Sequence, residues 1–233
     1  NNNITNDYST AIGVTNSVSG SVATAIGGLN IASADYTCTI GYSNVASVFG
    51  AVAVGNQNTS SGNSAFSAGI LCTAANVAAL ALGYYAYAAS YAELAHASGN
   101  APGSPQNSRV QISGVTAASA STSVDLKAGP SADQEVITRT GRIYSVRVVF
   151  VATSTTFGTV GRIELTDALI KNSGGTVSVI DAGTSYLSAT TPTDWGIALS
   201  GSGANLRVTF SKTAGAVALR CSALVELVDV AAP

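Results

Sequence analysis

Four acidic residues in the second half of the chain are the first candidates for chemistry. A pair of carboxylates can hydrolyse a glycan, with one as general acid and the other as base or nucleophile. The candidates are Glu164, Asp167, Asp181 and Asp194. Their spacing along the chain does not bring two of them together, so we expect no catalytic residue and no enzyme. Glu226 is instead expected to form a cross-strand ion pair with Arg220.

The other reactive side chains form no catalytic or metal-binding pattern. His96 is the only histidine and has no cysteine near it in the sequence, which argues against a zinc site. The sequence has no G-x-S-x-G elbow for a serine nucleophile and no G-x-x-x-x-G-K-[ST] loop for a nucleotide. Cys38, Cys72 and Cys221 are odd in number and far apart, which indicates buried free thiols. We therefore expect no metal and no cofactor.

Aromatic residues are the candidates for ligand binding. Trp195 is the only tryptophan, and a lone tryptophan in a β-domain is usually a core anchor. Its alternative role is a platform that stacks on a sugar, together with Tyr186 nearby in the sequence. Four tyrosines in the first half are expected to widen the last repeats, or to form a second carbohydrate-facing patch. They are Tyr84, Tyr85, Tyr87 and Tyr91.

The composition excludes two classes of partner. Charged residues make up 9% of the chain, the net charge is −2, and no lysine or arginine precedes Arg109. A nucleic-acid-binding protein needs a basic face, so we expect no nucleic acid as partner. The apolar stretch "VAALALGYYAYAASYA" at 77–92 is shorter than the roughly 20 residues of a membrane span, so we expect no membrane insertion. The chain has no methionine, so we expect a processed product or a piece of a longer protein.

The elements that would position these residues begin with a repeat. A glycine returns every fourteen residues, at Gly13, Gly27, Gly41, Gly55, Gly69 and Gly83. Small and apolar residues alternate before each glycine, as in "TAIG" and "AVAVG", which predicts a short strand. Glycine and the asparagine three residues later tolerate positive φ, so both are expected to mark turns. Fourteen residues then form one coil of a β-solenoid with two strands and two turns.

The repeat also predicts how the solenoid ends and what covers it. The next glycine, Gly99, comes after sixteen residues, so we expect the last coil to be irregular. Alanine and serine fill the inner positions because a thin coil has little room. Each coil has one modest apolar face that must be covered. Identical chains around a threefold axis would cover it most simply, so we expect a homotrimer.

Several stretches of the repeat carry a resemblance to a known family. "SNVASVFGAVAVG" at 43–55, which includes "GAVAVG" at 50–55, and "GNSAFSAG" at 62–69 resemble the fourteen-residue head repeats of trimeric autotransporter adhesins of the YadA type. The resemblance covers roughly residues 9–99 and implies a left-handed parallel β-roll in an intertwined trimer. Those adhesins continue into a coiled-coil stalk and a membrane anchor, for which this sequence shows no heptads and no terminal barrel strand.

The amino-acid composition changes between the two halves of the chain. "GNAPGSPQNS" at 99–108 holds two prolines among glycine, serine and asparagine, which is typical of a linker. We expect a β-roll at 1–99, a linker at 100–108 and an antiparallel β-sandwich at 109–233. Five stretches rich in β-branched and aromatic residues predict strands of this sandwich. They lie at 142–154, 161–170, 176–183, 205–212 and 216–230.

The second half resembles the terminal β-sandwich of many phage tail and virion proteins. The resemblance covers roughly 135–230, and Trp195, Arg220 and Glu226 fit its outline. It implies a trimeric tail fibre or tailspike on the virion. The C-terminal domain would bind a host cell-surface glycan or protein, and the N-terminal side would contact other virion proteins. The alternatives are a capsid-decorating cement trimer, the head of a bacterial cell-surface adhesin, and a polysaccharide depolymerase.

Overall fold

The computed structural model describes residues 1–99, 105–118, 122–129, 135–154, 159–214 and 217–231. These residues divide into two compact units, Asn1–Ser108 and Arg109–Pro233. Every element in the described part of the chain is a β-strand. The predicted all-β class is confirmed, and the first unit is a parallel β-solenoid of seven turns. In that part of the chain, no helix has the length and hydropathy needed to cross a bilayer.

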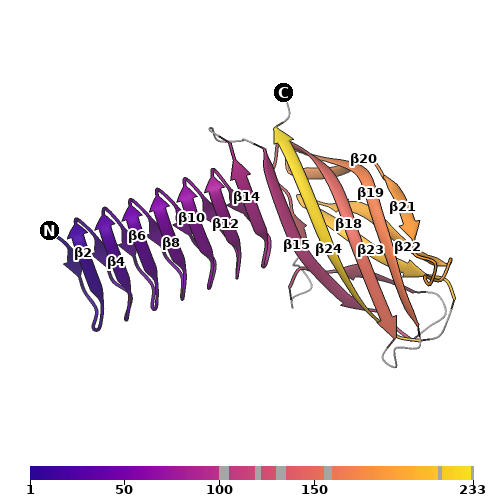
Figure 1. The fold of residues 1–233 in the computed structure, drawn as a ribbon, viewed down its shortest axis with the longest axis horizontal. Helices are drawn as coiled ribbons and strands as arrows, with labels where there is room; N and C mark the ends of the chain where they lie inside the picture. The colour runs from indigo at the N-terminus through magenta and orange to yellow at the C-terminus, as the bar shows by residue number, and fades with distance from the viewer. Residues whose placement is uncertain (100–104, 119–121, 130–134, 155–158, 215–216, 232–233) are drawn as a thin grey trace. The chain divides into compact units, whose positions relative to one another are not determined.

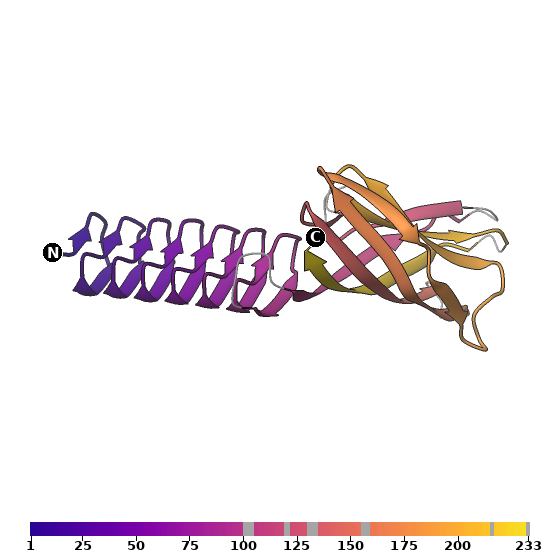
Figure 2. The same cartoon turned by 90° about the horizontal axis from the view of Figure 1, so that it is seen from above.

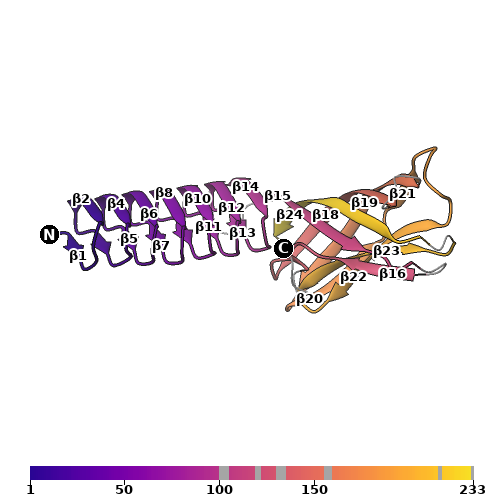
Figure 3. The same cartoon turned by 90° about the horizontal axis from the view of Figure 1, so that it is seen from below.

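Each turn of the solenoid contributes one long and one short strand (Figures 1 and 3). The long strands pair in parallel, and each residue faces the residue fourteen positions later, as Gly69 faces Gly83. They are β2 (Thr10–Val14), β4 (Thr24–Gly28), β6 (Cys38–Tyr42), β8 (Val52–Asn56), β10 (Phe66–Ile70), β12 (Leu80–Tyr84) and β14 (Leu94–Ser98). The short strands form a second parallel sheet. They are β1 (Asn3–Ile4), β3 (Ser17–Val18), β5 (Ile31–Ala32), β7 (Val45–Ala46), β9 (Thr59–Ser60), β11 (Thr73–Ala74) and β13 (Tyr87–Ala88).

The interior of the solenoid is narrow. Alternate residues of the long strands point inward, and Ala25, Ala53 and Ala81 are fully buried there. The small side chains of the inner columns allow the two sheets to lie close together. Little apolar area is buried per coil, so backbone and side-chain hydrogen bonds between coils carry much of the specificity.

The repeating glycines lie inside the long strands, at the fourth position of each. Their φ values run from +106° to +128°, a region that L side chains rarely adopt. A Cβ on Gly27 would come within 2.0 Å of the carbonyl oxygen of Gly41 in the next coil. Ala97 takes this position in the last coil, in register with Gly83. The expected irregular ending at Gly99 is therefore wrong, because the seventh coil keeps the spacing of fourteen.

The corners of the coils hold residues in the left-handed region. One set precedes the column of Asn16, Asn30, Asn44, Asn58, Cys72 and Ala86, and the other precedes each long strand by two residues. The first set is Thr15, Leu29, Ser43, Gln57, Leu71 and Tyr85. The second set is Tyr8, Val22, Tyr36, Gly50, Ser64, Ala78 and Ala92. Positive φ was expected at the asparagines, and this is wrong because the residue before each one adopts it.

The asparagines instead form a ladder of buried side chains along the solenoid. The Oδ1 atom of Asn30 accepts hydrogen bonds from the backbone N–H and the Nδ2 of Asn44, both at 3.0 Å. The Nδ2 of Asn44 also donates to the carbonyl oxygens of Ile40 at 3.0 Å and Gly55 at 2.8 Å. The same pattern joins Asn2, Asn16, Asn30, Asn44 and Asn58. The ladder ends at Cys72, whose N–H donates to Asn58 Oδ1 at 2.9 Å.

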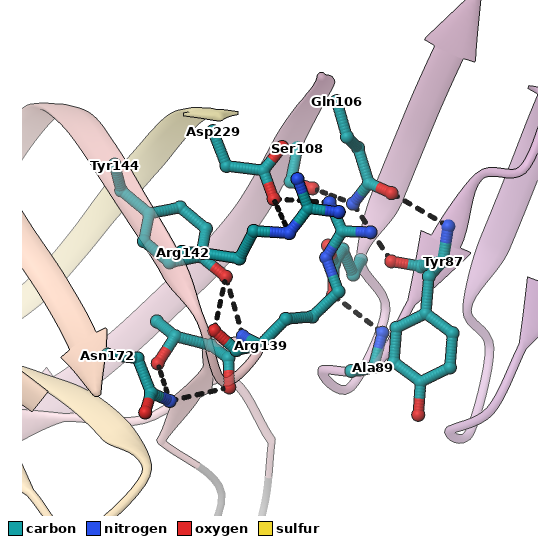
Figure 4. A network of polar contacts seen from close by, with 11 residues as sticks. Tyr87, Ala89, Gln106, Ser108, Arg139, Arg142, Tyr144, Asn172 and Asp229 are labelled. Atoms are coloured by element: carbon teal, nitrogen blue, oxygen red, sulfur yellow. Dashed lines mark hydrogen bonds and ion pairs between the residues drawn. The ribbon is translucent and has the colours of Figure 1, made fainter. Parts of the chain in front are cut away.

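Two side chains form hydrogen bonds with backbone groups of the last coil of the solenoid. Gln106 accepts a hydrogen bond from the N–H of Tyr87 at 2.7 Å and donates to its carbonyl oxygen at 2.9 Å (Figure 4). The Gln106 amide thus satisfies backbone groups that a further short strand would bind. Glu93 is buried, and its Oε2 accepts hydrogen bonds from the N–H groups of Ala89 at 2.8 Å and Ser90 at 2.7 Å.

Burial raises the pKa of the Glu93 carboxyl, although its hydrogen bonds act in the opposite direction. A raised folded-state pKa means that Glu93 contributes stability at pH values below its unfolded pKa and loses it as the pH rises through the folded value. Glu93→Gln removes the charge and keeps an oxygen for Ala89 and Ser90. We expect its melting temperature at pH 7 to exceed that of the unmodified chain, with no advantage at pH 4. Thermal unfolding at both pH values tests this, and an equal or lower melting temperature at pH 7 contradicts it.

The second unit is built from two antiparallel sheets (Figures 1 and 2). The first has the strand order β15–β24–β18–β19–β20, with β21 also paired to β19, and the second places β16, β17 and β22 around β23. The bounds of the first sheet are β15 (Gln106–Val115), β24 (Leu219–Ala231), β18 (Arg142–Ser154), β19 (Val160–Ser173), β20 (Thr176–Asp181) and β21 (Thr184–Leu187). Those of the second are β16 (Thr122–Leu126), β17 (Val136–Ile137), β22 (Trp195–Ser202) and β23 (Asn205–Lys212).

Aromatic residues of the two sheets pack against each other in the core of the second unit. Phe150 of β18 stacks on Phe210 of β23 with ring centroids 4.5 Å apart. The strands expected at 142–154 and 205–212 are present with those bounds. The closed sandwich and the trimer stay predictions. Of the expected linker, residues 100–104 lie outside the described residues, and Gln106–Ser108 form the start of β15.

Candidate functional site

Glu164 lies in an ion-pair network on the outer face of β18 and β19. Its Oε1 is 2.5 Å from Nη2 of Arg147, and its Oε2 is 2.6 Å from Nη2 of Arg162. The hydrogen bonds from Arg147 hold the pKa of this carboxyl below its ordinary value. A general acid for glycoside hydrolysis needs a raised pKa, so Glu164 is poorly suited to that role.

Glu226 extends the same network across β24. It lies 2.9 Å from Nη1 of Arg147 and 3.1 Å from Nε of Arg109. Arg220 is in the same strand as Glu226. The expected cross-strand pair of these two residues is therefore wrong, because the residue facing Glu226 is Arg147 of β18.

Asp167 and Asp181 shape the backbone. Asp167 has φ of 61° and accepts a hydrogen bond from the hydroxyl of Thr166 at 2.9 Å. Asp181 accepts a hydrogen bond from the N–H of Gly183 at 2.9 Å. Both contacts are local, and that of Asp181 stabilises the turn between β20 and β21.

Asp194 lies at the wall of a cavity in the second unit. Its Oδ2 accepts hydrogen bonds from the N–H groups of Thr213 at 3.1 Å and Ala214 at 2.8 Å. The cavity measures about 290 Å³ and opens where β22 begins, β23 ends and β24 begins. Its lining residues are Thr159, Pro192, Asp194, Trp195, Lys212, Ala214, Val217 and Leu219. Of the four acidic candidates, Asp194 is the one that lines this cavity.

Trp195 forms part of the cavity wall while being anchored in the core. The residue is 5% exposed, and its ring meets Phe210 edge to face at 5.3 Å. A Cβ at Gly161 would approach the indole within 2.7 Å, so the backbone of β19 also packs on it. The indole is therefore a fixed wall and not an exposed platform. Tyr186, by contrast, is exposed on β21 and is outside the cavity lining, so the structure does not join the two binding candidates.

Lys212 is a charged residue of the cavity lining that was not predicted from the sequence. It is only 2% exposed, and its Nζ donates a hydrogen bond to the carbonyl oxygen of Val217 at 2.7 Å. Leu206, Val208 and Phe210 precede it on the buried face of β23. The period-two alternation of this strand could have placed Lys212 inside. The cavity thus combines an ammonium, a carboxylate and an indole.

The remaining sequence candidates are distributed over other parts of the chain. His96 is exposed on β14, in register with Leu82. Cys72 is buried in the solenoid and Cys38 is half-buried. Burial raises the pKa of the Cys221 thiol in the second unit to about 12, which makes it unreactive at neutral pH. The described residues include no group of three or more side chains placed to hold a metal ion.

The tyrosines of the last coils do not form one patch. The rings of Tyr84 and Tyr85 lie 4.7 Å apart, and Tyr87 is on the short-strand sheet. Tyr91 lies at the turn before the last long strand.

A second polar cluster surrounds Asp229 in the second unit (Figure 4). Its carboxylate bonds to the guanidinium of Arg139 and lies 3.7 Å from Nε of Arg142. The Tyr144 hydroxyl accepts a hydrogen bond from the N–H of Arg139 at 2.5 Å, and burial raises the pKa of Tyr144 to about 12. The cluster ties the chain before β18 to β24 through the ion pair of Arg139 and Asp229.

Comparison with known proteins gives distant similarity only. Neither a protein-family model nor a curated protein matches this chain. Among solved structures, it is similar to the tailspike protein of Acinetobacter baumannii phage AM24, with 10% identity and a TM-score of 0.32 over 94% of this chain and 53% of that one. It is also similar to the tailspike of A. baumannii bacteriophage Fri1, described as a capsular polysaccharide depolymerase. There the identity is 6% and the TM-score 0.26, over 94% of this chain and 44% of that one.

These likenesses correct one expectation. The chain spans about half the length of the tailspikes it matches. Both TM-scores are below 0.5, so neither defines a shared fold. The expectation that this chain is not an enzyme is nevertheless contradicted, because one neighbour is described as a depolymerase.

Proposed function

We propose that this chain is part of a trimeric phage tail fibre or tailspike, and that its second unit binds a bacterial surface glycan. A tail fibre or tailspike would be located on the virion. The observation that supports the assembly best is the outward face of the long-strand sheet. The observation that supports glycan binding is the cavity at Trp195.

The central column of the outward face of the long strands is apolar in the first six coils. Residues that alternate with the buried alanines point away from the solenoid interior, and Ile12 is 56% exposed. The central column of this face is Ile12, Ile26, Ile40, Val54, Ala68, Leu82 and His96. A contiguous apolar surface of this kind is typical of an interface between chains. Three identical chains would cover it with the same residues in each.

The cavity has the composition of a sugar site. Trp195 and Pro192 offer apolar walls, and Asp194 and Lys212 offer an acceptor and a donor. A pyranose ring presents CH groups on its faces and hydroxyl groups at its edge, which match these two kinds of wall. Small-ligand sites generally combine mostly apolar walls with a few polar groups in this way.

The assembly is tested by mass and by thiol labelling. Light scattering is expected to give three times the chain mass of 23.1 kDa. Cys38 lies on the outward apolar face and should resist alkylation in the trimer. Ile40→Glu is expected to give single chains whose Cys38 is labelled rapidly. A single-chain mass for the unmodified protein would contradict the trimer.

Glycan binding is tested by filling the cavity from its rim. Ala214 is exposed and lines the cavity, so Ala214→Trp should close it without changing the core. We expect it to weaken binding to receptor-bearing bacteria roughly tenfold or more. Ala198→Trp on β22, exposed and outside the cavity, is the matched control. Equal binding by both variants would remove the cavity from the receptor site.

Depolymerisation of a surface polysaccharide is the second candidate function. It is favoured by the position of the Asp194 carboxylate in the wall of the same cavity. Release of reducing ends from purified capsule measures this activity. Asp194→Asn keeps an oxygen for Thr213 and Ala214 and should abolish the release if Asp194 takes part.

A further inference from the structure

A dipeptide repeats on one corner of the solenoid in a way that the fold does not require. Asp7–Tyr8 and Asp35–Tyr36 are separated by 28 residues, which is two coils. Tyr8 is 88% exposed and Tyr36 is 57% exposed. We propose that this corner is a second binding surface, which takes a neutral linear polysaccharide lying along the solenoid.

The backbone at these tyrosines is unfavourable for a large side chain. Tyr8 and Tyr36 both have φ of 59°, in the left-handed region. The later coils hold Gly50, Ser64 and Ala78 at the same corner. Large residues adopt this conformation at other corners as well, so the strain is general to the solenoid. What sets Tyr8 and Tyr36 apart is that large aromatic rings are left exposed there, which is expected of a binding surface.

Neighbouring side chains continue the apolar row. Val22 occupies the same corner in the coil between the two tyrosines and is exposed. The ring of Phe49 in the fourth coil meets the ring of Tyr36 edge to face at 5.3 Å, and it is also exposed. Four successive coils therefore present Tyr8, Val22, Tyr36 and Phe49 on one edge.

Carboxylates accompany both tyrosines. Asp7 and Asp35 are exposed, and they are the only acidic residues among the first 92. The backbone N–H of Ser21 donates to Oδ1 of Asp35 at 2.8 Å, which orients that carboxylate. Each Asp–Tyr pair thus combines a face for stacking with an acceptor for hydroxyl groups.

The repetition indicates a ligand that itself repeats. Coils of a β-solenoid rise about 4.8 Å each, so the two Asp–Tyr pairs lie roughly 10 Å apart. This spacing is comparable with two sugar units of an extended chain. The solenoid has no lysine or arginine, and like charges repel, so the two carboxylates favour a neutral polymer over an acidic one.

Affinity electrophoresis of the full chain tests this surface. The probes are hydroxyethyl cellulose, dextran and a panel of purified neutral capsular polysaccharides. The double variant Tyr8→Gly/Tyr36→Gly should lose retardation roughly tenfold or more. Its melting temperature should be equal or higher, because glycine tolerates positive φ. The matched control is Ser64→Gly/Ala78→Gly, which changes the same backbone positions in later coils and should bind normally.

The outcomes separate this surface from the cavity. Loss of retardation in the tyrosine variant but not in Ala214→Trp supports the proposal. The reverse result overturns it and leaves the cavity as the glycan site. A smaller solution mass for the tyrosine variant overturns it too, because the rings would then be packing against another chain. Absence of retardation of the unmodified chain by every probe also overturns it.

Discussion

Replacing Gly27 by alanine is expected to unfold part of the solenoid. The added Cβ would lie 2.0 Å from the carbonyl oxygen of Gly41, which belongs to the backbone of the next coil and cannot rotate away. Gly27 also has φ of +116°, which alanine rarely adopts. Backbone strain and overpacking each contribute about 1–3 kcal/mol, so we expect a loss of about 2–6 kcal/mol in the free energy of unfolding.

The next residue provides the matched control. Gly28 is in the same strand, but the nearest atom to an added Cβ is a ring carbon of Tyr42 at 3.4 Å. Gly28→Ala should change stability by less than about 0.5 kcal/mol, as is usual for a tolerated substitution. Urea unfolding combined with hydrogen exchange over residues 10–56 measures both variants. Equal stability of the two would show that the coils do not stack as tightly as described.

Replacing Asn44 by alanine is expected to be almost as damaging. Asn44 is fully buried, and the substitution leaves the carbonyl oxygens of Ile40 and Gly55 and the N–H of Asn58 without their partner. Each buried polar group without a hydrogen bond costs about 1–3 kcal/mol. We expect a total loss of about 3 kcal/mol or more.

Two further variants isolate the ladder from other effects. Asn56 is exposed at the end of β8, and Asn56→Ala should leave stability within about 0.5 kcal/mol. Asn44→Asp would place a carboxyl group against the same two carbonyl oxygens, so its protonated form should be favoured. Its stability is therefore expected to fall as the pH rises from 4 to 7. A flat pH profile, or equal stability of the Asn44 and Asn56 alanine variants, would contradict the ladder.

The solenoid could be predicted from the sequence because its geometry is imposed on every coil. A column of glycine is required wherever the backbone of one coil touches the next, and the period of fourteen follows directly. The role of asparagine could not be read in the same way. Asparagine is frequent both at positive φ and in side-chain ladders, so its type alone does not decide between the two roles. In the structure Leu29 adopts the positive φ, and Asn30 forms the ladder.

Strands of the second unit could be predicted from the sequence where apolar and polar residues alternate regularly. The stretch at 142–154 has buried residues at every second position, and its bounds were found. β22 was not among the strands predicted from β-branched and aromatic residues, because its glycine and serine residues resemble a turn. The cavity was missed for a different reason. Its walls come from the ends of three successive strands and from Thr159, and their meeting depends on how the strands pair. Lys212 looks like a surface residue unless the alternation of buried and exposed residues in β23 is followed to the end of the strand.

The ladder also determines how the solenoid responds to pulling along its axis. Coils are joined only to their neighbours, so a tensile load passes through every junction in series. The asparagine ladder stops at Cys72, which leaves the last junctions with fewer bonds than the first. Under tension these would open before the others, one coil at a time. Each released coil turns a rise of about 4.8 Å into roughly 45–50 Å of extended chain. We therefore expect the coils after Cys72 to separate first when the solenoid is pulled along its axis.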